Sequence, residues 1–78
     1  MIKMTQKEVN EAIRLHGLWL KDKTTGERAD FSGKDLSGLK FRGANLNGAY
    51  LSDANLRNVG LRLAYFSNAN LRCANLRG

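Results

Sequence analysis

The chain has 78 residues, a formal net charge of +6, a single cysteine and no proline. This length predicts one small domain with a marginal core, and the lone Cys73 excludes an internal disulfide and favours a reducing, cytoplasmic setting. No apolar run approaches the roughly 20 residues that span a bilayer, no secretory leader is expected, and the basic balance favours acidic partners such as nucleic acid or an acidic protein surface.

Residues 1–28 are predicted to form a capping helix and an entry turn. Residues 1–4 are expected to be a loose lead-in, and an amphipathic helix is expected over residues 5–20. Thr5 and Glu8 have the spacing of a capping box, in which each side chain binds the backbone N–H of the other residue. The apolar stripe of this helix is expected to consist of Val9, Ala12, Ile13, His16 and Leu20, with Leu15 and Trp19 beside it. The polar segment 21–28 has the composition of a turn.

Residues 29–78 are ten consecutive blocks of five residues: ADFSG, KDLSG, LKFRG, ANLNG, AYLSD, ANLRN, VGLRL, AYFSN, ANLRC and ANLRG. Each block has Leu or Phe at its third position, and most end in a turn residue such as Gly, Asn or Asp. A period of five suits neither a helix nor a flat strand, so the chain has to turn a corner within each block to keep its large apolar residues on one side. A short fixed period is typical of stacked repeat architectures.

Blocks of the form A(D/N)LxG resemble the pentapeptide-repeat family. The stretch LHGLWL (residues 15–20), followed by GERADFSG (residues 26–33), resembles the head segment that precedes the repeats in some members. The resemblance implies an all-β solenoid, a right-handed quadrilateral β-helix with four blocks per coil. Carried over, residues 29–48, 49–68 and 69–78 give about two and a half coils, with the N-terminal α-helix as a cap.

This register predicts interior columns of residues twenty apart: Phe31, Leu51 and Leu71; Leu36, Leu56 and Leu76; Phe41 and Leu61; Leu46 and Phe66. Lys34, Leu39 and Val59 stand where small inward residues are expected. Lys34 is expected to swing outward or to distort the first coil.

Residues that could support catalysis are too few and too scattered, and the chain is predicted not to be an enzyme and to bind no cofactor or metal. His16 is expected to be a half-buried packing residue of the helix. One histidine and one cysteine cannot supply the four ligands of a structural zinc site. Asp30 and Asp35 fall on different faces and make a poor acid–base pair.

Binding is therefore expected to involve the outer surface. Residues 54–78 carry four arginines and no acidic residue, and Arg/Tyr-rich surfaces are typical of binding hot spots. The predicted partner-binding residues are Lys40, Arg42, Arg57, Arg62, Arg72, Arg77, Tyr50, Tyr65 and Leu63. The favoured function is a non-catalytic inhibitor or regulator of an acidic or nucleic-acid-handling partner, for example a phage-type inhibitor of a CRISPR effector or nuclease.

Two alternatives are direct nucleic-acid binding through the arginine faces and a purely structural, self-associating repeat protein. The gyrase mimicry of some family members requires an acidic surface, which this basic chain lacks. A homodimer is also predicted, because an uncovered C-terminal end would expose core residues and unpaired strand-like backbone. Its interface residues are expected to be Leu56, Leu61, Phe66, Leu71 and Leu76.

Overall fold

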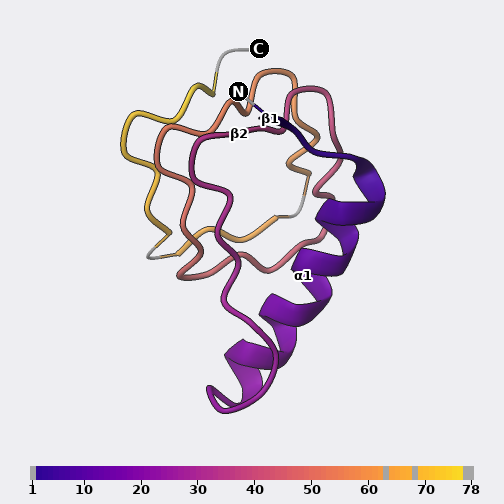
Figure 1. Cartoon of the computed structure of the whole chain (residues 1–78), viewed down its shortest axis with the longest axis vertical. Helices are drawn as coiled ribbons and strands as arrows, with labels where there is room; N and C mark the ends of the chain where they lie inside the picture. The colour runs from indigo at the N-terminus through magenta and orange to yellow at the C-terminus, as the bar shows by residue number, and fades with distance from the viewer. Residues whose placement is uncertain (1, 63, 68, 77–78) are drawn as a thin grey trace.

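The computed structural model describes residues 2–62, 64–67 and 69–76. Its named elements are strand β1 (Ile2–Lys3), helix α1 (Gln6–Lys21) and strand β2 (Lys34–Asp35). After α1 the chain passes over itself in stacked loops, and α1 lies across one side of them (Figure 1). The molecule measures 33 Å along its longest axis and 24 Å along the other two.

Parallel pairing joins residues that are twenty positions apart in the repeats. Residues 30, 35, 40 and 45 pair with residues 50, 55, 60 and 65, and residues 50 and 55 pair in turn with residues 70 and 75. We refer to residues 29–48 as the first layer, to 49–67 as the second and to 69–76 as the third. Because each block contributes one pairing residue, the pairing forms isolated bridges rather than the long strands that an all-β description suggests.

The same backbone hydrogen bonds recur in successive blocks. In the blocks from residue 29 to residue 58, the N–H of the third-position residue donates to the layer above, as from Phe31 to the Tyr50 carbonyl at 2.8 Å. The N–H that opens a block donates to the third-position carbonyl of the block before it, as from Ala44 to Phe41 at 2.9 Å, and closes a tight turn. The fifth residue of the block lies in this turn and often has a positive φ, for example 68° at Gly33, which glycine adopts without strain.

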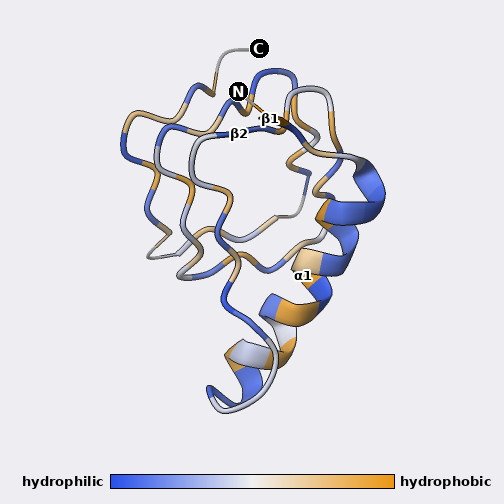
Figure 2. Ribbon diagram, viewed as in Figure 1, coloured by the Kyte–Doolittle hydropathy of each residue, from blue (hydrophilic) through white to orange (hydrophobic). Residues whose placement is uncertain are grey.

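The core lies inside the first two layers and is built from the residues that the register predicts. Phe31, Leu36, Phe41, Leu46, Leu51 and Leu56 are at most 2% exposed. Small residues at the first position, such as Ala49 and Ala54, are buried beside them. Hydrophobic and hydrophilic residues alternate at short intervals along the layers, as this inward and outward pattern requires (Figure 2).

Helix α1 begins at the predicted N-cap. Thr5 accepts a hydrogen bond from the Glu8 N–H at 3.1 Å, and Glu8 Oε1 accepts one from the Thr5 N–H at 2.8 Å. The capping box is therefore confirmed. Val9 and His16, on the inner stripe of the helix, are completely buried.

One expectation about the start of the chain is wrong, and of the two outcomes expected at Lys34 the distortion of the first layer is absent. Residues 2–4 are not a loose lead-in, because β1 pairs in parallel with β2 and the Met4 N–H donates to the Asp35 carbonyl at 3.0 Å. Lys34 does not distort the first layer either. Its N–H makes the same turn bond to the Phe31 carbonyl that alanine makes in other blocks, and its side chain is half-buried.

Candidate interaction surfaces

His16 joins the helix to both ends of the first layer. Its Nδ1 accepts a hydrogen bond from the Ala29 N–H at 2.9 Å, and its Nε2 lies 2.8 Å from the Asn47 carbonyl oxygen. An imidazole that accepts at Nδ1 and donates at Nε2 is the neutral Nε2–H tautomer. His16 is thus a fully buried structural link, rather than the half-buried packing residue expected from the helical stripe.

The role of His16 follows from the turn pattern. The first residue of each later block donates its N–H to a carbonyl of the preceding block, but no repeat block precedes Ala29. The imidazole supplies the missing acceptor. Sequence reasoning placed His16 on the correct helical stripe but could not find this contact, because its partner Asn47 lies 31 residues away.

One edge of the first layer faces away from the second layer, and we call it the lower edge. Its backbone is covered at two other places. On the side of β2, β1 supplies strand pairing. On the next side, the Gln6 carboxamide donates to the Lys40 carbonyl and accepts from the Lys40 N–H, both at 2.9 Å. A side-chain amide here replaces the backbone peptide of an absent layer.

Arg28 forms an aromatic cluster at the corner where the chain enters the repeats. Its guanidinium lies 4.1 Å from the Tyr50 ring centroid and 5.0 Å from that of Trp19, and its Nε donates to the Gly48 carbonyl at 2.7 Å. The Lys23 ammonium lies over the Trp19 ring, 4.1 Å from its centroid. These contacts hold the entry segment against the end of the first layer.

The predicted basic residues are exposed where the structure describes them. Lys40, Arg42, Arg57, Arg62 and Arg72 all lie at the surface. Arg62 stands one layer above Arg42 in the same column, since the Arg62 carbonyl accepts from Gly43, the residue after Arg42. Within the described chain these five cationic groups form no ion pair.

The other predicted binding residues fall into two groups. Tyr50 is 39% exposed but is engaged by Arg28, whereas Tyr65 is 60% exposed. Leu63 and Arg77 lie outside the described residues.

The upper edge, which is the edge of the second and third layers that faces away from the first layer, exposes part of the core in the described chain. Leu61, Phe66 and Leu71 are half-buried, and Leu76 is 50% exposed. The N–H groups of Leu61, Phe66 and Leu71 have no hydrogen-bond partner among the described residues, unlike the equivalent groups in lower layers. Leu56 differs from this group, because it is 2% exposed and its N–H donates to Asn75, so its side chain does not form part of the open edge.

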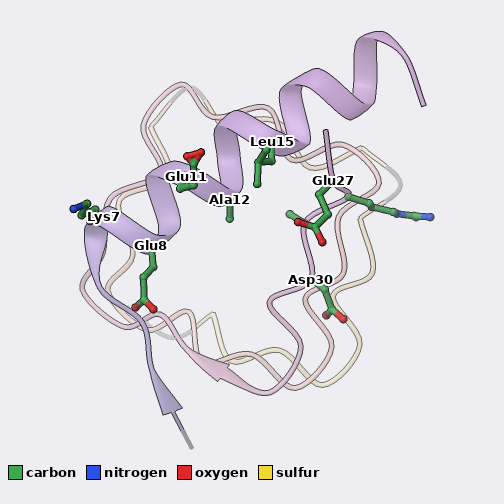
Figure 3. Close-up of a pocket in the computed structure, with 9 residues that line it drawn as sticks. Lys7, Glu8, Glu11, Ala12, Leu15, Glu27 and Asp30 are labelled. Carbon is green, nitrogen blue, oxygen red and sulfur yellow. The ribbon is translucent and has the colours of Figure 1, made fainter. Parts of the chain in front are cut away.

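A cleft of about 520 Å³ lies between α1 and the segment 27–30 that enters the first layer. Ala12 and Leu15 lie on the side of α1 toward Glu27 and Asp30 (Figure 3). We call this the head cleft. Four of the seven acidic residues of the chain line it, namely Glu8, Glu11, Glu27 and Asp30.

Local hydrogen bonds favour the charged form of three of these carboxyls, and the pKa of Glu11 is lowered by its hydrogen bond from Arg14. The Thr5 N–H lowers the pKa of Glu8, and hydrogen bonds from the Ser32 side chain and N–H lower the pKa of Asp30. Glu27 accepts no hydrogen bond from the described residues through its carboxylate, so its charge is available to a ligand.

Within residues 2–62, 64–67 and 69–76, no three His, Cys, Asp or Glu side chains gather as metal ligands. His16 has both ring nitrogens bound by backbone, and Cys73 is exposed at a turn. Among the described residues no helix has the length and apolar character needed to cross a membrane.

Comparison with known proteins agrees with the repeat pattern. The family model described as pentapeptide repeats matches eight copies, over residues 27–58 and 49–78. No curated protein matches the chain. Pentapeptide-repeat proteins have a β-helix type of fold and are generally non-catalytic protein-interaction modules. The matched segments cover well over half of the chain, which therefore belongs to the pentapeptide-repeat family.

Proposed function

We propose that the layers are the coils of a right-handed quadrilateral β-helix of about two and a half coils, capped by α1. The twenty-residue pairing supports four blocks per coil, and the recurring turn bond supports one corner per block. Such a fold gives flat, rigid faces on which side chains twenty residues apart lie in one column.

We further propose that this chain is a binding module that docks its basic faces on an acidic or nucleic-acid-handling partner. The observation that carries the proposal is the set of exposed cations without counter-ions, with Arg42 and Arg62 in one column and Lys40 on the same face. Like charges in one column repel each other, so they are not expected to stabilise the fold, and an acidic partner explains them best.

An inhibitor or regulator that acts in the cytoplasm fits this surface. A small rigid body with a basic face can occupy the acidic or nucleic-acid-binding site of a larger machine, as a phage-type inhibitor of a CRISPR effector or nuclease would. The net charge of +6 disfavours mimicry of DNA on gyrase.

Direct nucleic-acid binding through the same arginines is the second candidate. The exposed cations favour it, but the aromatic groups do not, because Tyr50 is held by Arg28 and Tyr65 stands apart from it on another face. Binding of single strands normally uses several stacked aromatic platforms.

A charge-reversal experiment separates these candidates. Arg42→Glu/Arg62→Glu removes the arginine column, and Lys21→Glu is the control, a charge reversal at an exposed lysine of α1 that lies outside the repeats and does not line the head cleft. Capture from nuclease-treated lysate is expected to fail for the arginine variant and to persist for the control. Direct nucleic-acid binding would instead appear as salt-dependent binding of a labelled duplex to the purified chain. Equal capture by both variants would contradict docking through this face.

Self-association is the third candidate, in the form of a homodimer through the upper edge. The half-buried Leu61, Phe66 and Leu71 and the exposed Leu76 support it, together with the unpaired N–H groups beside them. Light scattering at micromolar concentration is expected to give twice the 8.7 kDa chain mass, and Leu76→Glu to give the single mass. A single mass for the unmodified chain at all concentrations would contradict the dimer.

A further inference from the structure

The lower edge of the first layer is covered unevenly. At its four pairing positions, Asp35 is covered by β1 and Lys40 by the Gln6 side chain, whereas nothing in the described chain pairs with the backbone of Asp30 or Asn45. The backbone N–H and C=O of Asp30 face away from the second layer, because the groups that flank them bond to Tyr50. The Asp30 edge is therefore an unpaired strand position.

The Asp30 edge differs from the Asn45 edge in what lies beside it. The head cleft runs along segment 27–30, with Ala12 and Leu15 of α1 on its opposite side (Figure 3). Its volume of about 520 Å³ lies in the range of small-ligand and peptide sites. An open backbone edge next to a partly apolar cleft is the arrangement used when a sheet binds an extended peptide.

The neighbouring face shows how such a peptide would bind. Residues 2–4 of this chain lie in extended form along the same edge, with Ile2 and Lys3 opposite Lys34 and Asp35. Lys3 also reaches Asp35, at 3.9 Å between Nζ and Oδ1, and donates to the Ser37 carbonyl. On that face, an extended segment pairs with the first layer and places its basic side chain opposite an aspartate.

Carboxylates also surround the head cleft, as Asp35 stands opposite Lys3 on the neighbouring face. Four carboxylates line it against two cations, in a chain whose overall charge is +6. Glu11 is already paired with Arg14, with 2.5 Å between Arg14 Nη2 and Glu11 Oε1. Glu8 is held by the Thr5 N–H in the capping box. Glu27 and Asp30 form no ion pair within the described residues and flank the open Asp30 edge, so they are the groups that a cationic ligand would meet.

We propose that the head cleft binds a short, extended basic peptide segment of a partner protein, which pairs with the Asp30 backbone as β1 pairs with Asp35. Basic side chains of that segment bind Glu27 and Asp30, and its apolar side chains contact Ala12 and Leu15. The site is separate from the arginine faces and has the opposite charge, so it selects a different part of a partner.

Three probe peptides test the proposal on the unmodified chain by NMR titration. The first is a capped Lys-Val-Arg-Val-Lys peptide, whose alternation places all basic groups on one side of an extended strand. The second replaces its basic residues by Glu. The third carries a methyl group on the backbone nitrogen of the Val that follows Arg, which corresponds to the Met4 N–H that donates to the Asp35 carbonyl on the neighbouring face. The first is expected to shift the amide signals of Asp30 and Leu15 and to bind at least tenfold more tightly than the other two. Equal binding of the methylated peptide, or shifts that map elsewhere, would overturn the proposal.

Two variants give an independent check. Asp30→Asn keeps the local turn, because Asn45, Asn55 and Asn70 accept the same hydrogen bond from the N–H two residues on. With Glu27→Gln it removes both free charges, and the basic peptide is expected to bind about tenfold more weakly, the sum of two surface ion pairs.

Asp53→Asn is the matched control. It makes the same charge change as Asp30→Asn alone, at an exposed corner where the next block already carries Asn58 with a similar positive φ. It is expected to leave peptide binding within twofold. An equal loss in this control would show non-specific charge attraction and overturn the site. Arg42→Glu/Arg62→Glu is expected to keep peptide binding, so failure here and failure of the proposed docking function are distinguishable.

Discussion

The two ends of the repeat array are closed to different degrees. At the lower end, β1, Gln6 and His16 supply hydrogen bonds that a preceding layer would have made. At the upper end of the described chain, the N–H groups of Leu61, Phe66 and Leu71 have no partner. Their side chains are only half-buried, and that of Leu76 is exposed. The interior of a repeat protein is thus specified by its period, whereas each end needs residues that the period does not contain.

The largest expected change in the free energy of unfolding comes from truncating leucine side chains at two levels of the same interior column. Leu51 is fully buried and Leu71, directly above it in the register, is half-buried. Leu51→Ala is expected to lower the free energy of unfolding by about 2–5 kcal/mol, and Leu71→Ala by less than about half of that. Urea denaturation measures both. Equal losses would mean that the upper end is as well covered as the middle.

His16→Phe tests the closure of the lower end. The phenyl ring fills similar space but leaves the Ala29 N–H and the Asn47 carbonyl without their partner. Each buried unsatisfied group costs about 1–3 kcal/mol, so a loss of at least about 2 kcal/mol is expected in the same assay. A variant with unchanged stability would show that packing alone holds α1 in place.

The arginine column is expected to matter little for folding. Arg42→Gln and Arg62→Gln each remove an exposed charge without a counter-ion among the described residues, so each change in unfolding free energy is expected to stay below about 0.5 kcal/mol. Thermal denaturation measures it. A loss of more than about 1 kcal/mol would assign these arginines to the fold rather than to binding.

The smallest expected effect is a loss of stability in acid. Hydrogen bonds lower the pKa values of Glu8, Asp22, Asp30 and Asp35 in the folded state. The folded chain therefore binds fewer protons than the unfolded chain near pH 4, and the resulting stability is present above the unfolded pKa values and is lost as the pH falls through the folded ones. Denaturation between pH 6 and 2 measures this, and constant stability over that range would contradict it.

What the sequence predicts correctly is local or periodic. The capping box depends on residues three apart, and the interior columns follow from a period that runs without interruption. The contacts of His16 with Asn47 and of Gln6 with Lys40 join residues that are 31 and 34 positions apart. Neither His16 nor Gln6 belongs to a repeat. No pattern predicts such contacts, which is why the head cleft and the pairing of residues 2–4 appear only in three dimensions.

The Arg28 cluster illustrates the same limit for the surface. Tyr50 was expected to serve a partner because of its outward position in a block. Its ring instead faces Arg28, which comes from the entry segment and has no place in the repeat pattern. The exposure of the arginines in the repeats followed from position alone, since nothing outside the repeats reaches them in the described chain.

Amide hydrogen exchange tests the central claim, that the head covers part of the lower edge and leaves Asp30 open. Lys40 and Asp30 occupy the same position in their blocks and the same edge, and they differ in that Gln6 binds the Lys40 N–H. The account predicts slow exchange at Lys40 and Ala29 and fast exchange at Asp30, with Gln6→Ala raising the rate at Lys40 alone. Similar exchange rates at Lys40 and Asp30 in the unmodified chain would contradict it.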